Sequence, residues 1–74
     1  MDNLENRELL INLFEKYSSF LTQNQRQIFQ LYFFEDLSYA EISQITATTR
    51  SAIFDALKKT KIKLMKFYDE LERK

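Results

Sequence analysis

The sequence predicts an all-α protein: one four-helix domain that occupies residues 1–74 and ends in a long C-terminal helix. It contains no Gly and no Pro, the residues that β-hairpin turns need and that most often interrupt helices. Hydrophobic residues make up 45% of the chain and aromatic residues 15%, which is enough to build a core without cross-links. A chain of 74 residues has room for only one such core.

The first helix is expected over residues 3–19, where apolar residues recur at helical spacing. Asp2 or Asn3 can cap its start, because their side-chain oxygens accept hydrogen bonds from the unpaired N–H groups of a first turn. One face of this helix is apolar and needs a partner in the core. The residues of that face are Leu10, Leu13, Phe14 and Tyr17.

The second helix is expected over residues 22–35. Thr22 and Gln25 fit a capping box, in which the Thr hydroxyl accepts from the third N–H while the Gln side chain accepts from the cap. Near its C-terminal end the helix is apolar almost all round, which places it at the centre of the core. Its inner stripe is Ile28, Leu31 and Tyr32, broadened by Phe29, Phe33 and Phe34.

The third helix is expected over residues 38–45. Ser38 and Glu41 form another capping box, flanked by Leu37 and Ile42 as a hydrophobic staple. The helix is short because the Thr-Ala-Thr-Thr sequence that follows combines β-branching with hydroxyls that favour caps and turns.

The fourth helix is expected over residues 49–72, with Thr49, or alternatively Thr48, as its cap. At about 1.5 Å per residue it reaches roughly 35 to 40 Å, which is longer than a three-helix core needs. The overhang packs on the first helix, packs on a second subunit or frays. The expected inner stripe is Ile53, Leu57, Thr60, Leu64, Tyr68 and Leu71.

The composition excludes most enzyme chemistry. With no Cys and no His, the chain has no disulfides, no thiolate or imidazole metal ligands and no His or Cys catalysis. Glu35, Asp36 and Glu41 form the only carboxylate cluster worth testing as a metal or acid-base site, and helix capping explains it better than metal binding. We therefore expect no enzymatic activity, no cofactor, no metal and no small-molecule substrate.

The sequence predicts a cytoplasmic protein whose N-terminal half is acidic and whose C-terminal half is basic. It opens with no charged and apolar leader and holds no apolar run near the roughly 18 residues of a membrane span. Residues 1–36 hold three basic and six acidic groups, whereas residues 37–74 hold eight basic and five acidic groups. An anionic partner should therefore meet the C-terminal half.

A short capped helix, a tight turn and a longer helix that begins Thr-Arg-Ser is the order of a helix-turn-helix. In that motif the first helix spans the duplex backbone and the start of the second reaches base edges. Ile42 and Ile53 are expected to pack the two helices together. The predicted nucleic-acid-binding residues are Ser38, Thr48, Thr49, Arg50, Ser51, Phe54, Lys58 and Lys59.

These residues have different expected roles. Arg50 suits base or phosphate contacts, Ser51 a short-range polar contact, and the lysines either neutralise phosphates or solubilise an exposed face. Phe54 either touches a thymine methyl group or, as aromatics at helical spacing more often do, joins the core. Asp55 repels phosphate, and pairing with a lysine three or four residues later would offset its charge.

The turn departs from the usual pattern. Thr46 and Thr48 stand where such motifs bury aliphatic residues, and Ala47 stands where Gly commonly takes positive φ, at a cost of about 1 kcal/mol. Either Ile45 takes over the packing with a shifted turn, or this copy of the motif is weakened.

The chain resembles region 4 of bacterial sigma factors over about residues 19–64. In that region a helix-turn-helix recognises a promoter element. The residues that carry the resemblance are Leu21, Thr22, Gln25, Arg26, Leu31, Tyr32, Phe33, Asp36, Leu37, Ser38, Glu41, Ile42 and Arg50.

A closer resemblance is to the YlxM-type family of small helix-turn-helix proteins linked to the signal recognition particle operon. Asp55 favours this family, because sigma factors usually lack it. The matching residues are Arg50, Ala52, Ile53, Phe54, Asp55, Leu57, Lys58, Lys59 and Thr60, with a first helix that ends near Tyr17. The resemblance implies a DNA-binding regulator with a part in the signal recognition particle pathway.

The expected function is therefore a DNA-binding regulatory protein that presents its fourth helix to duplex DNA. One such module covers about 600 to 1,000 Å² of protein surface, so a neutral monomer binds weakly. Specific binding then needs a homodimer, through the first and C-terminal helices, or a partner. The alternative is a protein-interaction module, for RNA polymerase or a signal recognition particle component, which predicts an exposed apolar patch at Phe54, Phe33 or Phe34. DNA binding instead requires that the basic face is open and that this patch is buried.

Overall fold

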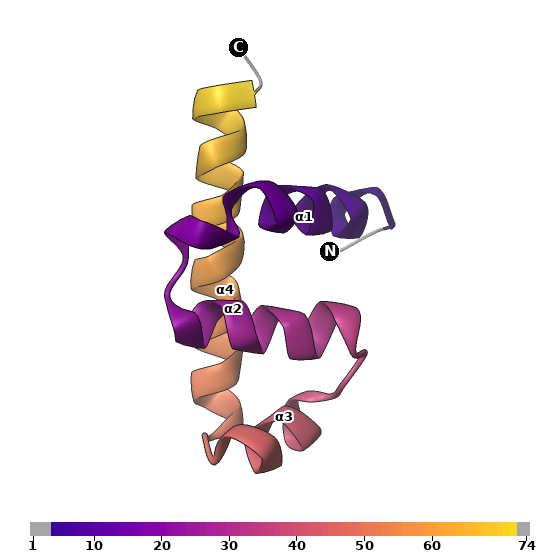
Figure 1. The fold of residues 1–74 in the computed structure, drawn as a ribbon. Coiled ribbons are helices and arrows are strands. Elements are labelled where there is room, and N and C mark those ends of the chain that lie inside the picture. The colour runs from indigo at the N-terminus through magenta and orange to yellow at the C-terminus, as the bar shows by residue number, and fades with distance from the viewer. Residues whose placement is uncertain (1–3, 73–74) are drawn as a thin grey trace.

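A computed structural model describes residues 4–72, and within them the chain is all-α and has no strand. The elements are α1 (Leu4–Tyr17), the 3₁₀ turn η1 (Ser18–Phe20), α2 (Gln23–Phe29), the π-helical turn η2 (Gln30–Phe34), α3 (Tyr39–Thr46), α4 (Arg50–Phe67) and the π-helical turn η3 (Tyr68–Glu72). In Figure 1, α1 and α2 lie across the long α4, and α3 packs beside its start. The expected long C-terminal helix is confirmed.

Both predicted capping boxes are present. The Thr22 hydroxyl accepts from the Gln25 N–H at 3.1 Å, and the Gln25 side chain accepts from the Thr22 N–H at 3.0 Å. Ser38 and Glu41 make the equivalent pair of hydrogen bonds at 3.2 and 2.9 Å. These side chains replace the intrahelical partners that the first turns of α2 and α3 lack, so both helices begin at a fixed residue.

The inner stripe predicted for the second helix is partly wrong. Phe29 and Phe33 are buried, whereas Leu31 and Tyr32 are only half-buried. The helix changes to π-type turns at η2, where the Glu35 N–H bonds to the Gln30 carbonyl at 3.1 Å. The wider turn shifts each following side chain around the axis, so an α-helical period misassigns the last turn.

The core lies where α1, α2 and α3 meet α4. Its centre is a row of aromatic rings, in which Phe14 stacks on Phe29 at 4.5 Å and Phe29 on Phe33 at 4.3 Å. Thr60 is buried among apolar residues, and its hydroxyl donates to the Ala56 carbonyl at 2.7 Å, so the polar atom is satisfied. The buried apolar residues are Leu10, Leu13, Phe14, Leu21, Ile28, Phe29, Phe33, Ile42, Ile53, Leu57 and Leu64.

The C-terminal overhang packs on α1, one of the three expected arrangements. The rings of Tyr17 and Phe67 lie 5.2 Å apart, and Lys16 and Tyr17 donate to Glu72 at 3.1 and 2.8 Å. Leu71 was expected in the inner stripe and is instead 63% exposed, because the π-helical turn η3 rotates it away from the core. The expected caps of the first helix, Asp2 and Asn3, lie outside the described residues.

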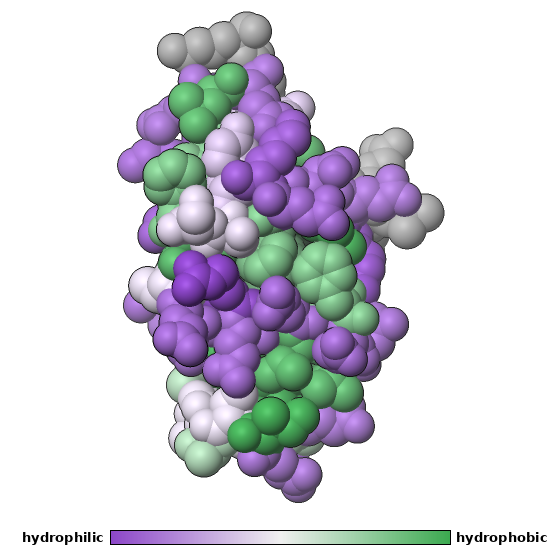
Figure 2. Space-filling model, viewed as in Figure 1, coloured by the Kyte–Doolittle hydropathy of each residue, from purple (hydrophilic) through white to green (hydrophobic). Residues whose placement is uncertain are grey.

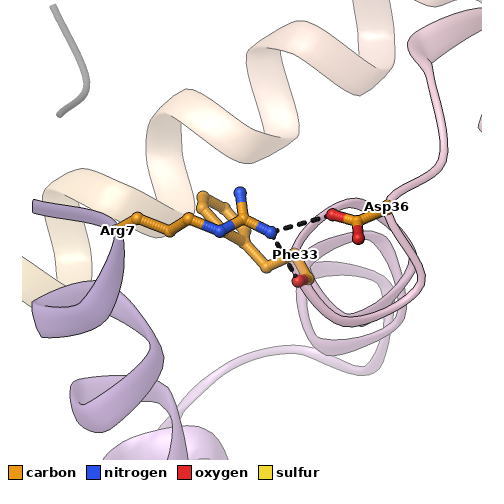
Figure 3. Close-up of polar contacts among 3 residues, drawn as sticks. All are labelled: Arg7, Phe33 and Asp36. Atoms are coloured by element: carbon orange, nitrogen blue, oxygen red, sulfur yellow. Dashed lines mark hydrogen bonds and ion pairs between the residues drawn. The ribbon is translucent and has the colours of Figure 1, made fainter. Parts of the chain in front are cut away.

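Arg7 ties α1 to the connection between α2 and α3 (Figure 3). Its Nη2 donates to the Phe33 carbonyl at 2.8 Å and to Asp36 Oδ1 at 3.0 Å. Asp36 has φ of 57°, a left-handed conformation that Asp adopts more readily than most residues, and it ends the second helix. The carboxylate cluster therefore divides between two structural roles, because Asp36 binds Arg7 and Glu41 caps α3.

Hydrophilic residues cover most of the face seen in Figure 2, with hydrophobic surface exposed between α1 and α2 and again at the foot of the molecule over α3. Phe34, at the end of η2, is 43% exposed. Among the helices of residues 4–72, none has the length and hydropathy that crossing a membrane requires.

Candidate nucleic-acid interface

The turn between α3 and α4 is closed by hydroxyl groups. Thr46 donates to the Ile42 carbonyl at 2.8 Å, Thr48 donates to the Thr46 carbonyl at 3.1 Å, and Ser43 donates to the Thr48 carbonyl. The Thr48 N–H also bonds back to the Ser43 carbonyl at 3.2 Å. Hydrogen bonds thus hold the turn where aliphatic packing was expected, so the threonines fit this turn rather than disrupt it.

Ala47 is the left-handed residue of the turn, as the sequence predicts, with φ of 55° and ψ of 40°. Ile45 is 58% exposed, so it does not take over the packing, and that alternative is wrong. Ile42 and Ile53 are both fully buried and join the two helices, as expected. The motif is therefore packed through Ile42 and Ile53 and carries the strain of a non-glycine residue at positive φ.

The start of α4 is capped and open to solvent. The Thr49 hydroxyl accepts from the Ala52 N–H at 3.1 Å, which assigns the cap to Thr49 rather than Thr48. Arg50 and Ser51 follow in the first turn, and both are exposed. A capped first turn presents these two side chains from a fixed backbone, the arrangement that base-edge contacts require.

Phe54 is 54% exposed, so the expectation that it joins the core is wrong. It lies one residue beyond the buried Ile53, on the side of α4 that faces the start of α3. There its ring meets Tyr39 in an edge-on contact with centroids 6.2 Å apart. Of the three phenylalanines of the expected apolar patch, Phe33 is buried, while Phe34 and Phe54 are exposed.

The two predicted lysines differ. Lys59 pairs with Asp55 at 3.1 Å, with both side chains exposed, so this pair largely cancels the negative charge next to the first turns of α4. Lys58 is exposed on the neighbouring side, one turn after Phe54. Lys58 therefore adds positive charge beside the phenylalanine, and Lys59 mainly compensates Asp55.

The structure brings most of the predicted residues to one end of the molecule. Thr49, Arg50, Ser51, Phe54 and Lys58 lie along the first turns of α4. Ser38 caps α3 directly before Tyr39, so it lies near Phe54. Thr48 is half-buried, and its hydroxyl closes the turn, so its main role is to stabilise the turn.

Sequence reasoning missed Tyr39 and Ile62, whereas Lys61 belongs to the lysines expected on the outer face of the fourth helix. These side chains join Phe54, Leu57 and Lys58 around a groove of about 370 Å³ between α3 and α4. Lys58 lies four residues after Phe54, and Ile62 lies four residues after Lys58, so a search along this side of α4 would have found Ile62. Among the described residues, no group of His, Cys, Asp and Glu gathers as a metal site would need.

Comparison with known proteins agrees with this arrangement. Residues 4–73 match the model of a family described as "Putative helix-turn-helix protein, YlxM / p13 like". Proteins named UPF0122 protein are 38% identical over 68 residues in Clostridium kluyveri, 42% over 67 residues in Clostridium perfringens and 38% over 68 residues in Bacillus thuringiensis.

These alignments cover 92%, 90% and 92% of the chain, but only 61%, 59% and 62% of the respective relatives. The chain therefore spans about three fifths of the length of the curated relatives it matches. The family match extends across all of the described residues, including the capped turn and the open start of α4. The chain belongs to the YlxM/p13-like helix-turn-helix family.

Proposed function

We propose that this protein is a cytoplasmic, non-enzymatic DNA-binding regulatory protein that acts in the signal recognition particle pathway. The observation that carries the proposal is the exposed, capped start of α4, where Arg50 and Ser51 project from a turn held by hydrogen bonds. The helix-turn-helix description of the family supports the same function. The pathway rests on the resemblance to YlxM-type proteins.

In the proposed mechanism, the first turns of α4 enter the major groove. Arg50 contacts a guanine edge or a phosphate, because its planar guanidinium can donate two parallel hydrogen bonds. Ser51 makes a polar contact at short range, and Lys58 neutralises a phosphate further along the groove. Ser38 and Thr49 lie at helix starts, where backbone N–H groups and the hydroxyls face the duplex backbone.

A single copy offers few phosphate contacts, so a monomer should bind DNA weakly. We propose that a homodimer, through α1 and the C-terminal part of α4, presents two copies of the first turns of α4. These two elements already pack together through Tyr17, Phe67 and Glu72, so a second subunit would contact their outer sides. A partner protein could supply the second contact instead.

The test is fluorescence-polarisation binding to random-sequence duplex DNA and to signal recognition particle RNA between 50 and 200 mM salt. Wild type is compared with the Arg50→Glu/Lys58→Glu double variant. We expect affinity to fall steeply with salt for wild type, and the slope to decrease by about two in the double variant, one for each lost phosphate contact.

The matched control is Lys66→Glu, because it changes net charge as much as Arg50→Glu but lies about 24 Å further along α4. Arg50→Glu should weaken duplex binding by about tenfold or more, and Lys66→Glu by much less. If both variants lose the same affinity, charge alone explains binding and the proposed interface is wrong. If wild type fails to bind at tens of micromolar, the nucleic-acid function itself is wrong.

The exposed Phe54 favours a second candidate function, a protein-interaction module for RNA polymerase or a signal recognition particle component. Exposed aromatic side chains are common anchors at protein interfaces. The two functions separate by experiment, since a protein interface centred on Phe54 requires the ring, whereas major-groove binding requires the charge of Arg50. A pull-down with purified RNA polymerase that Phe54→Ala abolishes and Arg50→Glu leaves intact would support this second function.

A further inference from the structure

The groove beside Phe54 has the dimensions and the lining of a binding site. It is a partly open hollow of about 370 Å³ between the start of α3 and the second and third turns of α4, within the size range of small-ligand pockets. We call it the Tyr39 groove. Its lining residues are Tyr39, Phe54, Leu57, Lys58, Lys61 and Ile62.

The aromatic rings of this groove form a supported row rather than isolated side chains. Tyr32 contacts Tyr39 with ring centroids 5.4 Å apart, and Tyr39 contacts Phe54 at 6.2 Å. Tyr32 in turn lies edge-on against the buried Phe33 at 5.1 Å. The row thus connects the core to the surface, so Phe54 presents an exposed ring whose neighbours limit its movement.

The charges around the groove favour an anionic ligand. Two of its six lining residues are lysines and none is acidic, and the nearest carboxylate on the outer side of α4, Asp55, is paired with Lys59. A second hollow of about 570 Å³ continues along α4 and shares Lys61 and Ile62 with the first. Lys66 lies in this continuation, and Asp69 and Glu70 close its far end.

We propose that the Tyr39 groove binds an unpaired nucleotide of single-stranded nucleic acid. Its base stacks on the ring of Phe54, its phosphate lies beside Lys58, and the strand continues along α4 towards Lys66. Aromatic rings interleaved with cations are the general means of binding single strands, because every base offers a face for stacking. This inference rests on the proposed nucleic-acid function, and it adds a ligand that a major-groove interface does not read.

An apolar protein segment is the competing occupant, since Ile62 is 59% exposed at the same groove. The observations favour the nucleotide because Lys58 and Lys61 line the same groove as the ring of Phe54, and no acidic residue lines it. A stacked base needs an aromatic ring, whereas a protein segment needs only apolar surface. Replacement of Phe54 by Leu separates the two, because Leu keeps the apolar surface and removes the ring.

The experiment measures binding of a fluorescein-labelled twelve-nucleotide oligouridylate, and of the same oligonucleotide with one central 2-aminopurine, whose fluorescence falls when it stacks. The variants are Phe54→Leu, the charge variant Lys58→Gln and the control Phe20→Leu. Phe20 is a suitable control because it is an aromatic residue, 60% exposed, that lies outside the groove. Thermal unfolding followed by circular dichroism verifies that each variant keeps the fold.

We expect wild type to bind the single strand and to quench 2-aminopurine. Phe54→Leu should weaken binding by about fivefold or more and abolish the quenching, Lys58→Gln should reduce the salt dependence, and Phe20→Leu should behave as wild type. The proposal is overturned if Phe54→Leu retains wild-type affinity and quenching, or if Phe20→Leu loses as much.

Absence of single-strand binding by wild type would also overturn the proposal. An apolar protein segment would then be the better candidate for the ligand of the groove. Loss of duplex binding in Arg50→Glu does not bear on this result, so a failure of the groove proposal can be distinguished from a failure of the major-groove interface. A Phe54→Leu variant that loses the single strand but keeps the duplex would support the groove as a separate site.

Discussion

The two sides of α4 carry similar side chains and have opposite surroundings. On the inner side, Ile53, Leu57 and Leu64 are at most 1% exposed, and α1, α2 and α3 cover them. On the outer side, Phe54 and Ile62 are 54% and 59% exposed. Both sides thus contain large apolar residues at helical spacing, and only one of them is used to fold the chain.

This difference separates the apolar residues that stabilise the fold from those that do not. Burial of the inner side supplies the hydrophobic free energy that holds the helices together, at roughly 25 cal/mol per Å² of apolar surface. The exposed apolar residues of the outer side add little to that free energy. Because the fold does not require them, the proposed binding of a nucleotide in the Tyr39 groove can be tested by changing them without unfolding the chain.

The largest expected effect comes from truncating the inner side. Leu57→Ala should lower the free energy of unfolding by about 2 to 5 kcal/mol, because it removes buried methyl groups and leaves a cavity. The same truncation on the outer side, Ile62→Ala, should change it by less than about 0.5 kcal/mol. Urea unfolding followed by circular dichroism measures both, and similar losses in the two variants would mean that Ile62 is buried in solution.

A smaller effect is expected at the start of the same helix. Thr49→Ala should cost about 1 kcal/mol, because the Ala52 N–H loses the hydroxyl that accepts from it. Ser51→Ala is the matched control, since Ser51 is exposed in the first turn and makes no cap. In urea unfolding, Thr49→Ala should have a lower free energy of unfolding than Ser51→Ala. Equal values in the two variants would argue against Thr49 as the cap.

The turn before α4 offers a change in the opposite direction. Ala47→Gly should raise the free energy of unfolding by up to about 1 kcal/mol, because Gly adopts φ of 55° without the steric cost that Ala bears. The gain is partly offset by the greater freedom of Gly in the unfolded chain. Thermal unfolding measures it, and a destabilised variant would show that the left-handed conformation is not occupied in solution.

Local signals in the sequence predicted the parts of the structure that depend on neighbouring residues. The capping boxes at Thr22 and Ser38 and the positive φ of Ala47 follow from contacts within a few residues, so reading the chain in order identifies them. The burial of Ile42 and Ile53 also follows, because the helix-turn-helix brings them together across a short turn.

The sequence did not predict features that depend on helix geometry or on distant segments. The π-helical turns at residues 30–34 and 68–72 shift the phase of the inner face, so Leu31 is only partly buried at the edge of the core and Leu71 is exposed. Phe54 was wrongly assigned to the core because its spacing fits a core helix. In the structure its ring lies at the surface, in contact with Tyr39 from the neighbouring helix. The groove combines residues from two helices, so neither helix alone reveals it.

The smallest expected effect concerns the tie between α1 and the end of α4. The hydrogen bond from Tyr17, together with that from Lys16, lowers the pKa of Glu72, and the same bond raises the pKa of Tyr17. Since a lowered carboxyl pKa means that the folded state prefers the charged form, the tie is present above the ordinary pKa of Glu72. It is lost as pH falls through the lowered value.

Nuclear magnetic resonance titration of the Tyr17 ring and the Glu72 carboxyl tests this tie at atomic level. In Glu72→Gln the pKa of Tyr17 should return towards its ordinary value, because the carboxylate no longer accepts its proton or repels its charged form. In Glu70→Gln, a change of equal charge at an exposed neighbour, it should stay raised. If both variants leave the Tyr17 pKa unchanged, the C-terminal turn does not stay on α1 in solution. The overhang would then be free to contact the second subunit of the proposed homodimer.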